Sequence, residues 1–293
     1  MPTFSTEPSV TSHAPGGAVR RAAVLGSPIA HSLSPVLHEA AYAVLGLGTW
    51  SYTRVECAED DLSGFVAGLG PEWAGLSLTM PLKRVALEVA TEVSAEAEAI
   101  GAANTLLLAP GRRRAENTDA PGMADALREA GLQIASTPLV LGAGGTAQAA
   151  LAALAAPGAG IAPLVDGPVT VLVRSPHRAD VLRTTAERLG LALDVRPLDE
   201  APTRLTAADL VISTLPKGIA DPLAHAALRP GAVVFDVVYD PWPTALATAA
   251  TAAGCRVVSG LDLLLHQAGH QVRLMTGREA PIEAMRAALA LAR

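Results

Sequence analysis

The chain has 293 residues, of which 50% are apolar and 17% are charged, and its formal net charge is −6. This length and composition predict a well-packed globular protein, with two domains favoured over one, and exclude a disordered chain. The negative charge argues against nucleic acid as a main partner, because phosphate groups are bound by basic surfaces.

Residues 1–19 are rich in Ser, Thr, Pro and Gly and lack an apolar stretch flanked by basic residues, so we expect a flexible tail and no signal peptide. Nowhere do 18 apolar residues run without interruption, and we expect no membrane span. Cys57 and Cys255 lie far apart. Two buried reduced thiols in a cytoplasmic protein are favoured over a lone disulfide. No Cys/His cluster indicates a metal site.

Strand and helix patterns alternate through the first 120 residues. A Pro-Gly turn at positions 110 and 111 predicts a hairpin between the last two strands of this region. The expected helices cover 35–45, 60–69 and 82–89, and the expected strands cover 21–26, 49–55, 75–79, 102–108 and 114–117.

A helix at 122–130 is expected to lead into a second unit. A Pro/Gly-rich stretch between 155 and 169 predicts an irregular loop. Two final helices, 261–276 and 281–291, have no strand after them and are expected to pack on the first unit or to bridge both. The second unit alternates strands and helices, which is typical of a doubly wound parallel sheet. Its expected helices cover 146–156 and 177–189, and its expected strands cover 138–141, 169–173, 194–197, 209–213, 233–237 and 256–258.

A buried strand pattern runs directly into a glycine turn. Gly142 permits the tight turn, Gly144 permits close approach of a pyrophosphate, and Ala147 is small enough for the helix to pack on the strand. The helix that follows directs free N–H groups toward the phosphates. Rather than a plain structural turn, we predict a dinucleotide site formed by Gly142, Ala143, Gly144, Gly145, Thr146 and Ala147.

The end of the next strand indicates which dinucleotide is bound. An NAD enzyme usually has Asp or Glu there, bonded to the ribose hydroxyls. Here the strand 169–173 is followed by Arg174, Ser175 and Arg178, with no acidic residue among them. Guanidinium groups bind phosphate through paired donors, so the pattern favours NADP(H) over NAD. The alternative is that these arginines only begin an exposed helix.

Six motifs follow one another along the chain: GSPIAHSLSP, GLSLTMPLK, GAANT, NTDAPG, FDVVYDPWPTAL and GLDLLLHQAG. In this order and spacing they resemble the shikimate dehydrogenase family, and the resemblance covers residues 22 to about 289. It implies an α/β protein with a Rossmann-type NADP domain and an α/β substrate domain. It also implies reduction of 3-dehydroshikimate to shikimate with NADPH.

The resemblance assigns the substrate carboxylate to the first motif. Residues at the positions of Ser32 and Ser34 hold this carboxylate in the family, and a tyrosine at the position of Tyr239 also reaches it. Read from the residues alone, the two serines are also suited to cap the helix that starts near Pro35.

Three further positions match family residues that bond the ring hydroxyls, namely Thr79, Asn104 and Gln267. An amide donates and accepts hydrogen bonds, which fits a hydroxyl group. The alternative for each is a turn or cap role, which is weakest for Gln267 because its helix is otherwise apolar.

The two residues expected to carry the chemistry are Lys83 and Asp119. The chain has only two lysines, Lys83 and Lys217, among its 22 basic residues. A partly buried lysine serves as acid and base, whereas arginine does not lose its proton. Asp119 is expected to hold the lysine and bond a substrate hydroxyl, and which of the two transfers the proton stays open. Lys217 is expected at the surface or beside the cofactor.

Strand ends containing Thr214 and Val237 are expected to line the nicotinamide ring, and Gly260 is expected to permit close backbone approach. Three positions depart from the family pattern. Ser77 stands where Asn is frequent, Val173 stands where Asn usually precedes the arginine, and Ala120 replaces a frequent glycine.

These observations predict an α/β enzyme of two domains. The substrate domain comprises 20–122 and is completed by 261–293, and the NADP domain comprises 123–260. We expect a small-molecule substrate, no nucleic acid or membrane partner, no metal, and a cytoplasmic monomer or homodimer. The rivals are a quinate/shikimate dehydrogenase that uses NAD and a non-catalytic NADP-binding sensor on the same fold.

Overall fold

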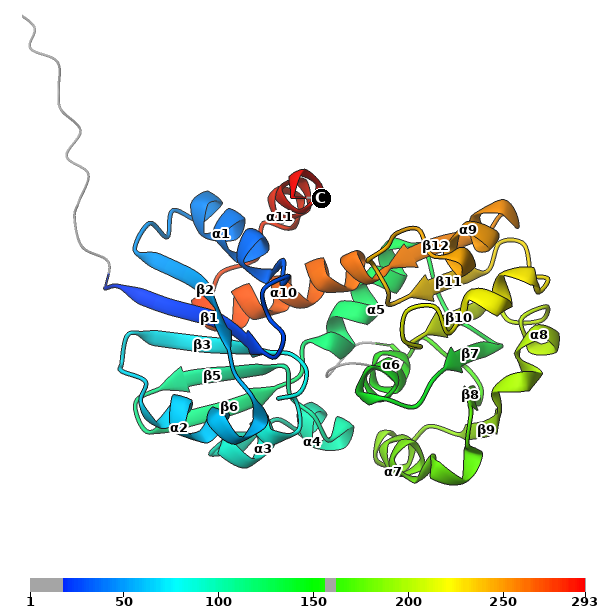
Figure 1. Cartoon of the computed structure of the whole chain (residues 1–293), viewed down its shortest axis with the longest axis horizontal. Coiled ribbons are helices and arrows are strands. Elements are labelled where there is room, and N and C mark those ends of the chain that lie inside the picture. Colours follow the sequence, from blue (N-terminus) through cyan, green and yellow to red (C-terminus); the bar gives the residue numbers. More distant parts are fainter. Residues whose placement is uncertain (1–17, 156–161, 293) are drawn as a thin grey trace, which may run out of the picture.

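The computed structural model describes residues 18–155 and 162–292, which form two β-sheets lying side by side with helices around them (Figure 1). The expected N-terminal tail falls almost entirely on residues 1–17, outside the described ranges. No helix in those ranges is long and apolar enough to cross a membrane.

The first sheet has the strand order β2-β1-β3-β5-β6-β4. Parallel pairing joins β1 to β2 and β3, while β5 runs antiparallel to both β3 and β6. The predicted hairpin is therefore confirmed. The strands are β1 (Arg20–Gly26), β2 (Trp50–Glu56), β3 (Trp73–Leu78), β4 (Glu92–Val93), β5 (Thr105–Ala109) and β6 (Arg112–Glu116).

Alternating apolar residues of β1 cover both faces of this sheet, because successive side chains of a strand point to opposite sides. Ala23 and Leu25 pack with α2 (Leu62–Ala67), α3 (Val85–Val89) and α4 (Ala95–Ile100). Ala22 and Val24 pack on the other face with Tyr42 of α1 (Ser34–Val44).

The second sheet is wholly parallel, in the order β12-β11-β10-β7-β8-β9. This is the doubly wound order of dinucleotide-binding domains, and its direction of winding reverses between β7 and β10. The predicted parallel sheet is confirmed. The strands are β7 (Pro138–Leu141), β8 (Val169–Val173), β9 (Leu193–Pro197), β10 (Leu210–Ser213), β11 (Val233–Asp236) and β12 (Arg256–Ser259).

Helices cover both faces of the second sheet, which explains why its strands are apolar almost throughout. One face packs against α5 (Asp119–Glu129), α6 (Gly145–Ala155) and α7 (Asp180–Leu189). The other packs against α8 (Ala201–Arg204) and α9 (Ala245–Ala252).

One long helix, together with α5, connects the halves of the molecule. The long α10 (Gly260–Thr276) starts at the second sheet and reaches the first, where it and α11 (Ile282–Leu291) pack against α1 (Figure 1). It lies against α5 so closely that a Cβ atom on Gly122 would meet the backbone nitrogen and Cα of Gln267. This close contact between α5 and α10 adjoins the residues that carry the predicted chemistry.

Several details differ from the sequence-based expectations. The helix expected at 82–89 starts only at Val85, so Lys83 lies in the preceding turn. The helix expected from residue 122 starts at Asp119, because Asn117 Oδ1 accepts hydrogen bonds from the first backbone N–H groups and a proline is tolerated in a first turn. The short elements β4 and α4 were not predicted at all.

Both cysteines are free, as expected. Cys57 is buried beside the first sheet, but Cys255 beside the second sheet is only partly buried, so its predicted full burial is wrong. Their separation between two different cores explains why they form no disulfide.

Candidate active site

A cavity of about 330 Å³ lies between the two sheets. Its wall combines the loop after β1, the end of β3, the turn before α3, the starts of α5 and α10, and the loop after β11. Three residues from the predicted cofactor set also reach it, namely Thr146, Val237 and Gly260. It brings together all eight predicted catalytic and substrate-binding residues: Ser32, Ser34, Thr79, Lys83, Asn104, Asp119, Tyr239 and Gln267.

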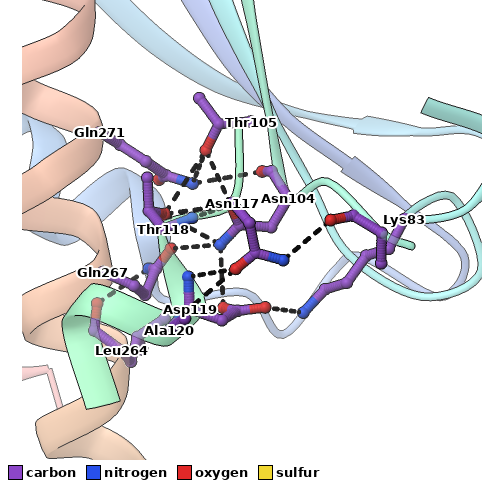
Figure 2. Close-up of polar contacts among 11 residues, drawn as sticks. Lys83, Asn104, Thr105, Asn117, Thr118, Asp119, Ala120, Leu264, Gln267 and Gln271 are labelled. Atoms are coloured by element: carbon purple, nitrogen blue, oxygen red, sulfur yellow. Dashed lines mark hydrogen bonds and ion pairs between the residues drawn. The ribbon is translucent and has the colours of Figure 1, made fainter. Parts of the chain in front are cut away.

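Lys83 and Asp119 form an ion pair, with Lys83 Nζ 2.5 Å from Asp119 Oδ2 (Figure 2). Their side chains are 30% and 12% exposed, so the pair is sheltered but reachable from the cavity. The backbone carbonyl of Lys83 accepts a hydrogen bond of 2.8 Å from Ala103 N–H, which fixes the turn that carries the lysine. The ammonium group can donate into the cavity while the carboxylate holds it in place.

Asn104 joins the other oxygen of the carboxylate to the surrounding structure. Its Nδ2 donates to Asp119 Oδ1 and to Thr118 Oγ1, each at 2.9 Å. Its Oδ1 accepts from the backbone N–H of Thr118 at 2.8 Å. Because a backbone N–H can only donate, the orientation of the Asn104 amide is unambiguous. Both oxygens of Asp119 are therefore engaged by donors.

Gln267 and Thr79 complete this side of the cavity. Gln267 is buried, and its Nε2 donates to the carbonyl of Leu264 within α10. Its Oε1 accepts a long hydrogen bond of 3.4 Å from Asn104 Nδ2. Thr79 is held at the end of β3 by a backbone bond to Leu25. In the described ranges none of these three side chains makes an N-cap hydrogen bond, but the carbonyl of Thr79 accepts from Leu82 N–H at 2.8 Å, so Thr79 has a turn role beside its place in the cavity wall.

Ser32, Ser34 and Tyr239 lie on the same cavity wall. Ser32 Oγ accepts from the backbone N–H of Ser34, the first residue of α1, so part of the capping alternative is realised. Arg54 Nε donates to the carbonyl of Ser32 at 2.8 Å and steadies the loop. Burial raises the pKa of Tyr239, with a further contribution from Asp240, so its phenol keeps its proton and can donate to an anion.

A second cavity, of about 750 Å³, opens beside the glycine turn. Gly142 there has φ of +111°, and a Cβ atom on it would collide with the hydroxyl of Thr214. Gly142 and Thr214 follow β7 and β10, the two strands between which the sheet reverses its winding. Six predicted cofactor residues line this cavity: Gly142, Ala143, Gly144, Arg174, Ser175 and Thr214.

Four further predicted cofactor residues are placed as follows. Ala147 is fully buried in the core and packs, as its position in the fingerprint requires. Gly260 meets the carbonyl of Val237 so closely that no side chain fits. Gly145 begins α6, and Arg178 ends the short 3-10 helix after Ser175; the Arg178 side chain is outside the described part of the structure.

The second cavity fits a dinucleotide phosphate. A Cβ atom on Gly144 or Gly145 would point into open space, so the fold by itself does not require glycine at either position. Arg174 and Lys217 line the same cavity, which places the second lysine beside the proposed cofactor. Glycines, cations and the N-terminus of α6 form a donor set suited to an anion. In the described ranges, no group of His, Cys, Asp or Glu is arranged to hold a metal ion.

The three residues that depart from the family pattern are all buried. Ser77 is buried, and its hydroxyl accepts from Tyr52 and donates to Gln271 Oε1 at 2.8 Å, so its polar contacts are made rather than lost. Val173 and Ala120 are both buried.

Sequence reasoning missed Gln271, which also lines the first cavity. The available signal was a second glutamine four residues after Gln267, on the same face of the helix.

The comparisons with known proteins agree with this geometry. Residues 24–106 match the family described as shikimate dehydrogenase substrate binding domain, and residues 260–290 match the shikimate 5'-dehydrogenase C-terminal domain. A shikimate dehydrogenase (NADP(+)) of Methanothermobacter thermautotrophicus is 36% identical over 276 residues, which cover 91% of this chain and 94% of that protein. The chain belongs to the shikimate dehydrogenase family.

Solved structures of shikimate dehydrogenases share the fold. That of Mycobacterium tuberculosis is 46% identical with a TM-score of 0.84, over 94% of this chain and 100% of that one. The Thermus thermophilus enzyme, solved in complex with NADP(H) and shikimate, is 35% identical with a TM-score of 0.79, again over 94% and 100%. The expected fold class and family are therefore confirmed.

Proposed function

We propose that this protein reduces 3-dehydroshikimate to shikimate with NADPH, in a reversible reaction of aromatic amino acid biosynthesis. The observation that carries the proposal is the Lys83–Asp119 ion pair in a cavity lined by all eight predicted residues. A dinucleotide-shaped site opens at the reversal point of the neighbouring sheet. Both parts belong to a family whose curated relatives are named for this activity.

The residues of the first cavity hold a cyclic hydroxy acid at both ends. The hydroxyls of Ser32 and Ser34, with the phenol of Tyr239, supply neutral donors to the carboxylate. Thr79, Asn104 and Gln267 bond the ring hydroxyls. Because the side chains of Ser32, Asn104 and Gln267 are held by hydrogen bonds, they orient the ring before reaction, which lowers the entropic part of the barrier.

Lys83 and Asp119 handle the proton. NADPH, when bound, supplies the hydride to the ketone carbon. The Lys83 ammonium group donates a hydrogen bond to the ketone oxygen, where negative charge develops, and gives up the proton that makes it a hydroxyl. Asp119 keeps the ammonium group in position through Oδ2 and holds a substrate hydroxyl, while Asn104 restrains Oδ1.

Cofactor choice rests on the strand end after β8. Arg174 and Ser175 line the second cavity where an NAD enzyme would present a carboxylate. A guanidinium group and a hydroxyl are suited to a 2′-phosphate, and an acidic side chain would repel it. This supports NADP(H) as the cofactor.

Each of the two sheets forms the centre of one domain in this proposal. Residues 20–122, completed by 261–293, form the substrate domain, and residues 123–260 form the NADP domain. The boundary falls within α5, so this helix and α10 are the candidate hinge for closure over substrate. We further propose that the protein is cytoplasmic and is a monomer or a homodimer.

Turnover measured with each combination of substrate and cofactor tests the function. Purified protein is mixed with shikimate or quinate and with NADP⁺ or NAD⁺, and absorbance of the reduced cofactor is followed. We expect the fastest reaction with shikimate and NADP⁺. Absence of turnover with every pair would favour the non-catalytic sensor, and faster turnover of quinate with NAD⁺ would favour the rival dehydrogenase.

A further inference from the structure

Gln271 of α10 is a fully buried amide in the wall of the substrate cavity, at 1% exposure, and the proposed mechanism does not use it. It lies one helical turn beyond Gln267. All four hydrogen-bonding positions of its side chain are occupied. Its Nε2 donates to Thr105 Oγ1 at 3.0 Å and to the carbonyl of Asn104 at 3.3 Å, and its Oε1 accepts from Ser77 Oγ at 2.8 Å and from His38 Nε2 at 3.3 Å.

The orientation of this amide follows from its partners. The carbonyl oxygen of Asn104 can only accept, so Nε2 of Gln271 must face it. Oε1 then faces Ser77, whose hydroxyl is free to donate because it already accepts from Tyr52 OH at 2.6 Å. Reversing the amide would place two acceptors together at Asn104, a costly arrangement in a buried site.

The partners of Gln271 are themselves fixed. Burial lowers the pKa of His38 to about 3, despite an opposing contribution from its bond to Gln271, so the ring is neutral with one N–H. Because Gln271 Oε1 can only accept, this proton is on Nε2, and Nδ1 accepts from Tyr42 OH. The imidazole stacks on Tyr52 with ring centroids 3.9 Å apart.

We propose that Gln271 is a positioning residue for the two amides that bind the ring hydroxyls. It acts on Asn104 directly, through the backbone carbonyl and through Thr105, whose hydroxyl donates to Asn104 Oδ1 at 2.9 Å (Figure 2). It acts on Gln267 through the shared helix, because it ties α10 to β3 and to the start of β5. This inference rests on the proposed function.

Hydrogen bonds, which are directional, are needed between α10 and the first sheet. On the side of α5, His266 and His270 of α10 bond to Glu129 and Asp125 at 2.8 Å, so that contact is polar. On the side of the first sheet, Met275 of α10 packs through apolar contacts, which permit a helix to slide or rotate. The hydrogen bonds that join Gln271 to Ser77, Thr105 and Asn104 therefore fix α10 against β3 and the start of β5, in addition to the restraint that α5 supplies. The amide of Gln267 is then held at a fixed position in the cavity wall relative to the first sheet.

Two substitutions separate positioning from packing. Gln271→Met keeps the length and removes every hydrogen bond, and Gln271→Glu keeps the shape and removes the two Nε2 donors. For Gln271→Met we expect KM for shikimate to rise about tenfold and kcat to fall, with KM for NADP⁺ unchanged within about twofold. The control for lost stability is Leu246→Ala, which removes buried contacts beside the second sheet.

A pH series supplies a second readout. A buried carboxyl tends to take up a proton, and the protonated group regains one O–H donor toward Asn104 or Thr105. The activity of Gln271→Glu, relative to wild type, should therefore recover between pH 8 and pH 6. Because a buried carboxylate also destabilises the fold as the pH rises, Tm is measured at each pH, and the recovery of activity should appear where the Tm of the variant stays well above the assay temperature.

The outcomes decide between the two proposals. If wild type turns over shikimate and Gln271→Met has the same KM as wild type, the positioning role is wrong. It is also wrong if Gln271→Met changes KM no more than Leu246→Ala does when the two variants lose a similar amount of Tm. A pH-independent ratio for Gln271→Glu contradicts it as well. If wild type itself shows no turnover with any substrate, the function fails and the role of Gln271 fails with it.

Discussion

At the scale of single residues, the proposed chemistry uses Lys83, one of two lysines in a chain that otherwise uses arginine. Lys83 and Lys217 are the only lysines, and each lines one of the two cavities that form the site. Arginine would carry the same charge in both places. In the proposed mechanism, only the Lys83 position requires a group that can also give up its proton.

Lys83→Ala is expected to lower kcat for shikimate oxidation by at least about 100-fold, because a general acid–base group is lost. Binding of NADPH, measured by fluorescence titration, should persist, since Lys83 does not line the second cavity. Lys83→Arg is the matched variant, because it keeps the charge beside Asp119. If Lys83→Arg retains most of the activity, charge and not proton transfer is the contribution of this residue.

At the scale of elements, the site depends on the close contact of α5 with α10. Asp119 begins the first helix and Gln267 lies in the middle of the second, and Gly122 lets their backbones approach. The glycine of the NTDAPG motif thus has a packing reason, and the same contact brings the carboxylate that we propose to be catalytic close to an amide that we propose to bind substrate.

Gly122→Ala is expected to destabilise the protein and to raise KM for shikimate, because the added methyl group would meet the backbone of Gln267. Gly64→Ala is the matched control. A Cβ atom on Gly64, within α2, would meet nothing nearby, so that variant should gain up to about 1 kcal/mol from helix propensity. Thermal melts and KM values check both, and an unchanged KM in Gly122→Ala would separate this glycine from the site.

At the scale of the whole molecule, Glu96 contributes a pH dependence to the stability of the fold. Glu96 in α4 is half-buried, and its Oε1 atom has no hydrogen-bond partner among the described residues. Burial, with repulsion from Glu116, raises its pKa to about 7 from the ordinary 4.5. The folded state therefore holds this proton more tightly than the unfolded chain does. The resulting contribution to stability is fully present below pH 4.5 and is lost as the pH rises to 7.

Glu96→Gln is accordingly expected to be more stable than wild type at pH 8, by about 2 kcal/mol, because it carries no charge to bury. The difference should narrow as the pH falls and vanish near pH 4. Urea unfolding of both proteins at several pH values measures this. A constant difference across the series would mean that Glu96 does not titrate in this range.

The sequence by itself predicted most of the elements, the parallel second sheet, the hairpin of the first sheet and the residues that meet in the first cavity. Period-two and helical patterns depend on near neighbours in the chain, and the glycine turn, the strand after it and Lys83 were readable for that reason. The elements missed, β4 and α4, are short, and their apolar signal is correspondingly weak. The late start of α3 was also missed, because bonds from other strands hold the preceding turn.

Only the tertiary structure decided how distant residues meet. The bond of Asn104 to Asp119 joins residues 15 apart, but Gln271 joins Asn104 across 167 positions and Ser77 across 194. Such bonds depend on where α10 comes to rest, which no local pattern specifies. The sequence therefore identified the groups to which we assign the reaction, whereas long-range packing determined the orientation of each amide and hydroxyl that holds them.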